Sequence, residues 1–202
     1  MKNAAVGFRT HSGWTSVVVV ALEKGKPVVL LRQHVHLVKT FNYSFRQPYH
    51  TAARAPLEAG RAFLQQVQED ARNLAYEALR SIRDKLQAAN CRLTHAGLLL
   101  SSSKPLPPLE KILAAHPLIH TADGELFREA LAHATEELRL KNFQVREKEL
   151  LIMGAKTLRR KRETLQRQLT ELGRSMGPPW SQDEKFAALA AWLSLCGSPM
   201  KK

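Results

Sequence analysis

A run of apolar residues near the middle of the chain, residues 93–100, constrains the fold more than any other part of the sequence. Its second half, Gly97-Leu-Leu-Leu100, is nearly continuous in apolar side chains rather than alternating. A strand of this composition is covered on both faces, as strands in the sheets of α/β proteins are. A polar loop and the start of a helix follow it, and α/β proteins usually bind ligands at such a place.

Two further strands are predicted ahead of this run. Residues 14–22 are rich in β-branched side chains, and residues 28–38 alternate between apolar side chains and polar ones such as Arg32 and His34. With Gly25 in the turn between them, they form an antiparallel hairpin that has one wet or lightly covered face. A third strand is possible at the start of residues 39–56, where aromatic side chains alternate (Phe41, Tyr43 and Phe45).

Helical periodicity predicts the elements that cover this sheet. Residues 57–89 carry apolar side chains at steps of three and four and form one long helix. Residues 141–146 form a short strand, and residues 147–172 form a single helix. The last helix, residues 182–195, begins at a capping box that runs from Ser181 to Glu184.

A pair of helices is predicted to follow the central strand. Pro117 ends a short helix over residues 109–115. Thr121 then caps a second helix, and Asp123 and Glu125 lie in its first turn, where carboxylates meet the positive end of the helix dipole. In the simplest interpretation these residues only cap the helix.

The order of these elements resembles the ribonuclease H-like fold: an antiparallel opening, then alternating helices and strands. We therefore expect an α/β protein with a mixed sheet, helices packed on it and a C-terminal helical extension. Residues 1–172 form the ribonuclease H-like domain, and residues 173–202 form the extension packed on the same domain. The resemblance implies metal-dependent cleavage only where the first strand carries a carboxylate. Residues 14–22 contain no Asp or Glu, which favours a non-catalytic relative such as the middle domain of translation release factors.

Several local runs are also similar to a family of short, uncharacterised bacterial proteins. The runs are His11-Ser-Gly-Trp14, Arg46-Gln-Pro-Tyr-His50, His120-Thr-Ala-Asp-Gly-Glu-Leu-Phe-Arg128 and the stretch from Pro178-Pro-Trp180 to Trp192. This resemblance implies a bacterial origin and no particular activity.

The charge of the chain indicates a polyanionic partner. The formal net charge is +13, and a surplus of that size attracts nucleic acid. The densest basic run is predicted to lie on one helix, with Arg162 turned inward and the other cations outward. We predict that these cations bind RNA or another polyanion through its phosphates: Lys156, Arg159, Arg160 and Lys161. A merely solvated helix face is the alternative.

A second function is an enzyme, because polar side chains gather at the ends of predicted elements. Such ends converge on one edge of a sheet. A small hydrolase or transferase acting on an anionic substrate would use His11, His50, His120 and Glu125 as catalytic groups, with His120 and Glu125 orienting a water. Ser12, Arg46 and Arg128 would bind the substrate. Whether the protein is an enzyme stays open at this point.

The sequence predicts neither a cofactor nor a metal site. His34 and His36 share a strand face without a third ligand, and Pro117 breaks the helix that would align His116 with His120. No phosphate loop or dinucleotide fingerprint is present. Two distant cysteines and the absence of a long apolar run indicate a cytoplasmic protein without a membrane partner.

Overall fold

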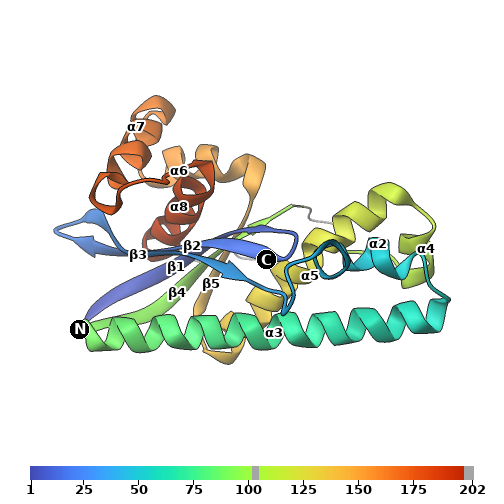
Figure 1. Ribbon diagram of the computed structural model, residues 1–202. Coiled ribbons are helices and arrows are strands. Elements are labelled where there is room, and N and C mark those ends of the chain that lie inside the picture. The colour runs from blue at the N-terminus through green and yellow to red at the C-terminus, as the bar shows by residue number, and fades with distance from the viewer. Residues whose placement is uncertain (102–104, 198–202) are drawn as a thin grey trace.

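The computed structural model of the chain describes residues 1–101 and 105–197. Its centre is a five-stranded sheet in the order β3-β2-β1-β4-β5 (Figure 1). The strands are β1 (Lys2–His11), β2 (Trp14–Glu23), β3 (Lys26–His36), β4 (Cys91–Leu100) and β5 (Lys141–Arg146). The first three pair antiparallel, and β4 lies parallel to both β1 and β5. The sheet is therefore mixed and opens with an antiparallel meander.

Helices cover both faces of the sheet. The long α3 (Leu57–Ala88) and α5 (His116–Glu137) lie on one face. On the other lie α6 (Leu150–Thr157), α7 (Arg162–Leu172) and α8 (Gln182–Cys196) (Figure 1). Short helices complete the chain: α1 (Tyr43–Arg46), α2 (Pro48–Ala52), α4 (Leu109–Leu113), η1 (Glu147–Glu149) and η2 (Arg174–Met176). None of the helices described is long and apolar enough to cross a membrane.

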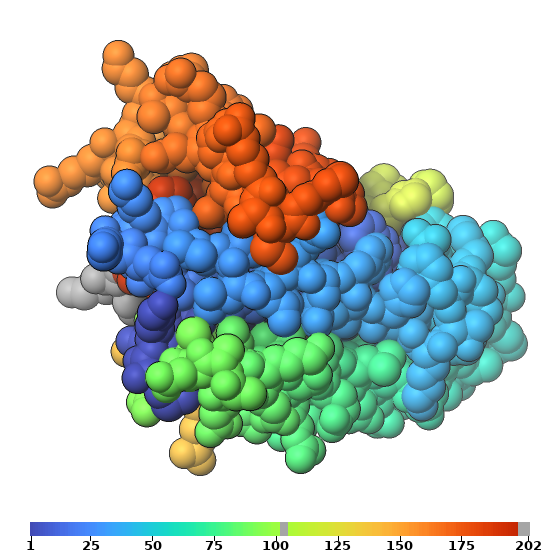
Figure 2. Space-filling model, turned by 60° about the vertical axis from the view of Figure 1, so that its left-hand side comes forward, coloured from blue at the N-terminus to red at the C-terminus, as the bar shows by residue number. Residues whose placement is uncertain are grey.

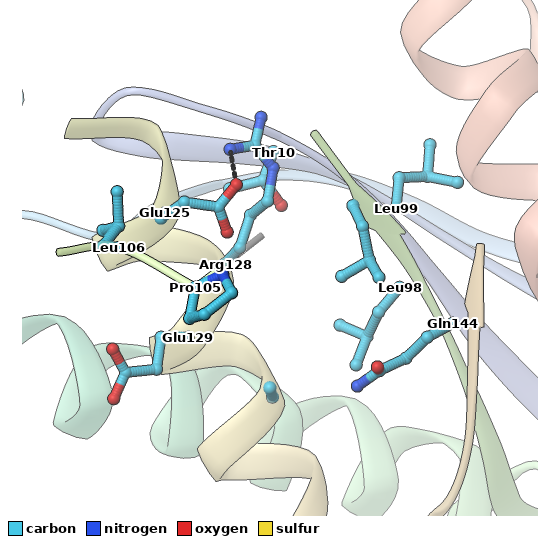
Figure 3. Close-up of a pocket in the computed structure, with 11 residues that line it drawn as sticks. Thr10, Leu98, Leu99, Pro105, Leu106, Glu125, Arg128, Glu129 and Gln144 are labelled. Carbon is cyan, nitrogen blue, oxygen red and sulfur yellow. Dashed lines mark hydrogen bonds and ion pairs between the residues drawn. The ribbon is translucent and has the colours of Figure 1, made fainter. Parts of the chain in front are cut away.

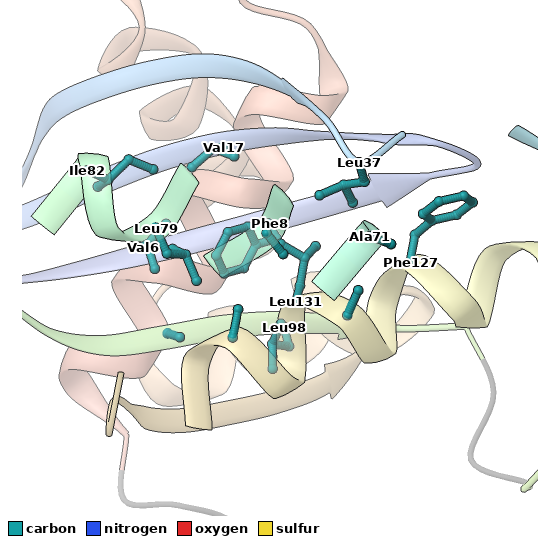
Figure 4. Packing of buried hydrophobic residues seen from close by; sticks show 14 of the residues in the cluster. Val6, Phe8, Val17, Leu37, Ala71, Leu79, Ile82, Leu98, Phe127 and Leu131 are labelled. Carbon is teal, nitrogen blue, oxygen red and sulfur yellow. The ribbon is translucent and has the colours of Figure 1, made fainter. Parts of the chain in front are cut away.

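The core between the sheet and α3 follows from simple periodicity. Even-numbered side chains of β1, such as Val6 and Phe8, point to this face because strand side chains alternate. They meet an apolar stripe of α3 that includes Leu79 and Ile82, together with Leu131 of α5 (Figure 4). The buried residues of α3 recur at steps of three and four, as the sequence predicts for residues 57–89.

The opposite core depends on an unusually close approach of α8 to the sheet. A Cβ atom on Gly7 of β1 would lie 1.9 Å from the Ala187 carbonyl oxygen. One on Gly97 of β4 would lie 2.3 Å from the Ala190 carbonyl oxygen. Residues 187–194 of α8 are all buried. The prediction that residues 1–172 form one domain and residues 173–202 an extension of it stays a prediction. In either case, α8 forms part of the helix layer that covers the second face of the sheet.

The first strand is β1, which the sequence pattern does not reveal. Alanines and Gly7 dominate its middle, and these residues have low β propensity. Gly7 is required here by the approach of α8, which is a tertiary contact. The prediction that residues 14–22 form the first strand is therefore wrong. The conclusion drawn from it is unaffected, since β1 also contains neither Asp nor Glu.

The possible strand after the hairpin is also absent, because this segment is helical. The Asn42 side chain accepts a hydrogen bond from the Phe45 amide at 3.1 Å and caps α1. Pro48 then occupies the first turn of α2, where a missing amide hydrogen costs nothing. Phe41 and Tyr43 are exposed rather than facing a sheet.

Pro117 starts a helix instead of ending one. It lies in the first turn of α5, which begins at His116. Thr121 does not cap the helix; its hydroxyl donates to the Pro117 carbonyl at 2.9 Å. The helix therefore contains His116 and His120 one turn apart on the same face.

The predicted helix over residues 147–172 is broken into two, α6 and α7. Arg159 adopts a φ of 51°. Its amide donates to the Lys156 carbonyl at 3.2 Å, and the Arg160 amide donates to the Ala155 carbonyl at 2.9 Å. This pair of bonds closes α6 in a Schellman motif. The turn folds α7 back so that Leu165 packs near Gly154 and is fully buried, which one straight helix would not allow.

Candidate binding cleft and histidine cluster

A cleft lies where β1 and β4 end and α5 begins. Its volume is about 350 Å³. Of the predicted site residues it brings together His11 and Ser12 from the end of β1 with His120 and Arg128 from α5. Thr10, Ser101, Thr121 and Gly124 complete the lining. Polar side chains far apart in the sequence thus converge on one sheet edge, as expected for an α/β fold.

Glu125 faces a neighbouring cavity of about 340 Å³. It pairs with Arg128, whose Nη1 lies 3.3 Å from Glu125 Oε1 (Figure 3). It also accepts a hydrogen bond from Ser101. His120 and Glu125 are five residues apart on one helix, so their side chains diverge by about 140°. The predicted His120–Glu125 pair is therefore not formed, because Arg128 and Ser101 engage the carboxylate instead.

His50 of α2 lies beside His120 and is held by a buried carboxylate. Its Nδ1 lies 2.5 Å from Oδ2 of Asp123. The other oxygen of Asp123 accepts from the Tyr49 amide at 2.7 Å. Asp123 is fully buried. Burial raises the pKa of this carboxyl, while the hydrogen bonds from His50 and Tyr49 oppose the rise.

Asp123 is the site residue that the sequence assigns to the wrong role. Its predicted place in the first turn of a helix suggested capping. In the structure α5 starts earlier, so Asp123 lies inside the helix and faces α2. Nothing in the local pattern signals this contact, because Tyr49 and His50 come from a different helix.

Three histidine rings gather beside the cleft. The ring centroid of His120 lies 4.5 Å from that of His50 and 4.4 Å from that of His116. The centroids of His50 and His116 are 5.4 Å apart. Each ring has a nitrogen that lies within 4.8 Å of a nitrogen of the other two. The expectation that Pro117 would keep His116 and His120 apart is wrong, because Pro117 lies within their common helix.

Arg46 supports the cleft from outside. Its Nε donates to the Ser12 carbonyl at 3.3 Å, and its guanidinium lies 4.5 Å from the ring centroid of Phe41. The side chain also packs against Gly13, whose φ is 85°. Arg46 thus holds the turn between β1 and β2, and its predicted role in substrate binding remains a prediction.

His11 also belongs to a network of charged side chains on the α8 side of the sheet. Its Nε2 lies 3.0 Å from Asp183 of α8, which also pairs with Arg9. Arg9 in turn donates to Glu147 at 2.7 Å. The ring of His11 stacks on Trp14 at 4.3 Å. Trp14 is also stacked on His34 from the next strand at 4.1 Å, so its faces are occupied by the protein.

The basic residues lie in and beside the turn that joins α6 to α7 rather than in a strip on one helix. The basic connector consists of Lys156, Arg159, Arg160, Lys161 and Arg162, all exposed. Arg162 does not turn inward as predicted, since it is the first residue of α7. In Figure 2 the segment that contains the connector, in orange, stands above the blue β3.

The connector lies mainly away from the cleft. Arg160 borders a cavity with Lys26 and Val28, at the far end of the β2–β3 hairpin from His11. Arg162 is the exception. It borders a cavity that is also lined by Ser101, and Ser101 is part of the cleft. The structure therefore separates the two predicted sites but leaves a basic residue between them.

Comparisons with known proteins identify the fold. No protein-family model matches the chain, and no curated protein sequence matches it. A structure of Thermus thermophilus RuvC in complex with a Holliday junction substrate is similar with a TM-score of 0.52 and 10% identity, over 93% of this chain and 89% of that chain. A second structure of Thermus thermophilus RuvC gives a TM-score of 0.51 and 12% identity, over 93% and 90% of the two chains. The likeness to RuvC confirms the predicted ribonuclease H-like α/β fold.

The proposed bacterial family has no support from these comparisons and remains a prediction. The metal centre of ribonuclease H-like nucleases does not fit this chain either. Such a centre needs a carboxylate on the first strand, and β1 reads Lys-Asn-Ala-Ala-Val-Gly-Phe-Arg-Thr-His. A carboxylate ligand for a hard cation such as Mg²⁺ is therefore missing from this strand.

Proposed function

We propose that this protein is a nucleic-acid-binding module whose basic connector contacts phosphates. The observation that carries the proposal is the exposure of the connector on a chain of formal net charge +13. Within residues 1–101 and 105–197, no carboxylate forms an ion pair with a connector side chain. These cations are therefore available to release counterions from a nucleic acid.

The fold gives the proposal a precedent. The RuvC structure of similar fold is bound to a Holliday junction. At 10% identity this likeness names no substrate for the present chain. RNA, as the charge pattern suggests, and DNA are both suitable ligands, because both present a phosphate backbone to the connector.

The connector is tested by removing charge without disturbing packing. Arg159→Gln, Arg160→Gln and Lys161→Gln together should weaken binding to single-stranded and duplex RNA and DNA. The slope of log affinity against log salt should shrink by about two to three units, since each phosphate contact contributes roughly 0.7 to 0.9. Fluorescence anisotropy at several salt concentrations measures both quantities.

A matched control variant removes three exposed cations that lie outside the connector. Arg80, Lys85 and Arg92 are exposed and lie on α3 and at the start of β4. Their replacement by Gln changes the net charge equally and should leave most of the affinity and slope intact. Equal losses in both triple variants would mean that net charge alone, rather than the connector, binds nucleic acid.

A second candidate function is a small hydrolase or transferase acting on an anionic substrate. The favouring observation is the cleft, where His11, His120 and Arg128 face one volume of about 350 Å³. A histidine would move a proton, and Arg128 would neutralise the substrate. Activity against phosphate and carboxylate esters should disappear in His120→Gln and persist in the triple connector variant. If activity survives in His120→Gln, the cleft is not the active site.

A further inference from the structure

We propose that His50, His116 and His120 form a binding site for a divalent transition-metal ion, and that Zn²⁺ suits it best. His116 and His120 are one turn apart on α5, and His50 faces them from α2. The three nitrogens lie within 4.8 Å of one another. No other part of the described chain brings three such ligands together.

The ligand chemistry selects the class of ion. Three imidazole nitrogens suit Zn²⁺, Co²⁺, Ni²⁺ or Cu²⁺ rather than Mg²⁺ or Ca²⁺, which prefer oxygen. Three protein ligands leave the fourth position of a tetrahedral Zn²⁺ open to water or a substrate. His120 also lines the cleft, so the ion would lie at its edge, near Arg128.

Asp123 supplies the support that a metal-binding histidine needs. A carboxylate that accepts from His50 Nδ1 fixes the tautomer in which Nε2 has its lone pair free for a metal. The Tyr49 amide holds Asp123 in place at 2.7 Å. A buried carboxylate behind an imidazole is a recurring arrangement at zinc sites. This observation is independent of the clustering of the three rings.

The site needs only a small adjustment to close on an ion. Nitrogens that are each about 2.0–2.1 Å from a tetrahedral Zn²⁺ lie about 3.4 Å apart. His50 is anchored by Asp123, with 12% of its side chain exposed. His116 and His120 are exposed, so rotation of their side chains brings the donors to that separation without moving the backbone.

The proposal goes beyond both proposed functions, because metal binding requires neither nucleic acid nor substrate. It is tested on the full-length protein, stripped with EDTA and titrated with ZnCl₂ by calorimetry. One Zn²⁺ should bind per chain. His116→Gln with His120→Gln should weaken binding by more than the 10–100-fold typical of losing a supporting partner.

The control pair is His34→Gln with His36→Gln. These histidines are exposed, and their ring centroids lie 5.4 Å apart on β3. Their replacement removes the same number of imidazoles and should leave Zn²⁺ affinity unchanged. Loss of Zn²⁺ binding in this pair, with retention in the α5 pair, would overturn the proposal. So would the absence of stoichiometric binding to the natural protein.

A spectroscopic measurement separates ligands from supporting residues. Co²⁺ in place of Zn²⁺ should give the intense visible absorption of a four-coordinate site, and the α5 pair should abolish it. Asp123→Asn should keep the absorption but weaken Zn²⁺ binding by roughly 10–100-fold. Nucleic-acid affinity in EDTA should be the same in all these variants, so the metal site and the proposed function can each fail alone. Loss of the Co²⁺ absorption in the His34 and His36 variant would also refute the assignment.

Discussion

Two glycines control how closely α8 approaches the sheet. At Gly7 and Gly97 any side chain would collide with the backbone of α8 rather than with a flexible side chain. Backbone cannot move aside without displacing the whole helix, and interiors tolerate added volume poorly. A single methyl group at either position is therefore incompatible with the observed packing.

Gly7→Ala is accordingly expected to destabilise the protein by about 3 kcal/mol or more, because it overpacks the interface between β1 and α8. Urea denaturation followed by circular dichroism measures the change. Gly25→Ala is the comparison. Gly25 has a φ of 76°, and no atom lies within 4 Å of the place that an added methyl group would take, so this change should cost only about 1–2 kcal/mol of backbone strain. A loss in Gly7→Ala no larger than that in Gly25→Ala would show that α8 can shift.

At the scale of elements, the capping box of α8 is a local feature of the sequence that positions a helix packed across the sheet. The amide of Ser181 donates to Glu184 Oε2 at 2.7 Å, and the Asp183 amide donates to Ser181 Oγ at 3.1 Å. This capping box was predicted from the sequence and is confirmed. It fixes the start of the helix that covers the central strands, and it places Asp183 against His11.

The capping box predicts a pH dependence of stability. Partial burial raises the pKa of Glu184, but hydrogen bonds from Ser181 outweigh it and hold the pKa below its ordinary value of 4.5. A carboxyl with a lowered pKa stabilises the folded state above pH 4.5, and this stabilisation is lost as pH falls through the folded-state pKa. Glu184→Gln cannot titrate at this position, so its free energy of unfolding should fall less than that of the natural protein between about pH 5 and pH 3. Identical acid profiles would mean that the carboxylate contributes nothing.

At the scale of the whole molecule, the two proposed sites lie on different parts of the surface. The cleft and the histidine cluster lie at the ends of β1 and β4, and the basic connector lies between α6 and α7. Arg162 and Ser101 line one cavity between them. Of the connector residues, Arg162 is thus the one that shares a cavity with a residue of the cleft.

The fold also predicts what the protein should not do. Because β1 carries no carboxylate, purified protein should not cleave RNA, duplex DNA or a four-way junction when Mg²⁺ or Mn²⁺ is added. Gel assays over several hours with the natural protein measure this. His120→Gln serves as the comparison, since a contaminating nuclease would be unaffected by it. Metal-dependent cleavage that disappears in His120→Gln would contradict this prediction.

The sequence by itself determined the α/β class, the long helix α3, the central strand β4 and the capping box of α8. These depend on periodicity and on contacts between near neighbours in the chain, which a local pattern records. It also indicated that polar ends of elements would meet, as His11 and His120 do in the cleft. The basic character of the connector was likewise apparent from the sequence.

Only the tertiary structure decided the rest. β1 was not predicted because its small residues are poor strand formers, and Gly7 among them is required by α8, which lies far away in the sequence. The break before Arg162 arises because Leu165 must reach the core. The histidine cluster exists because Pro117 begins α5 rather than ending a helix, and because Asp123 ties His50 to that helix. Such contacts join residues that no window of the sequence contains, so burial and packing decide them.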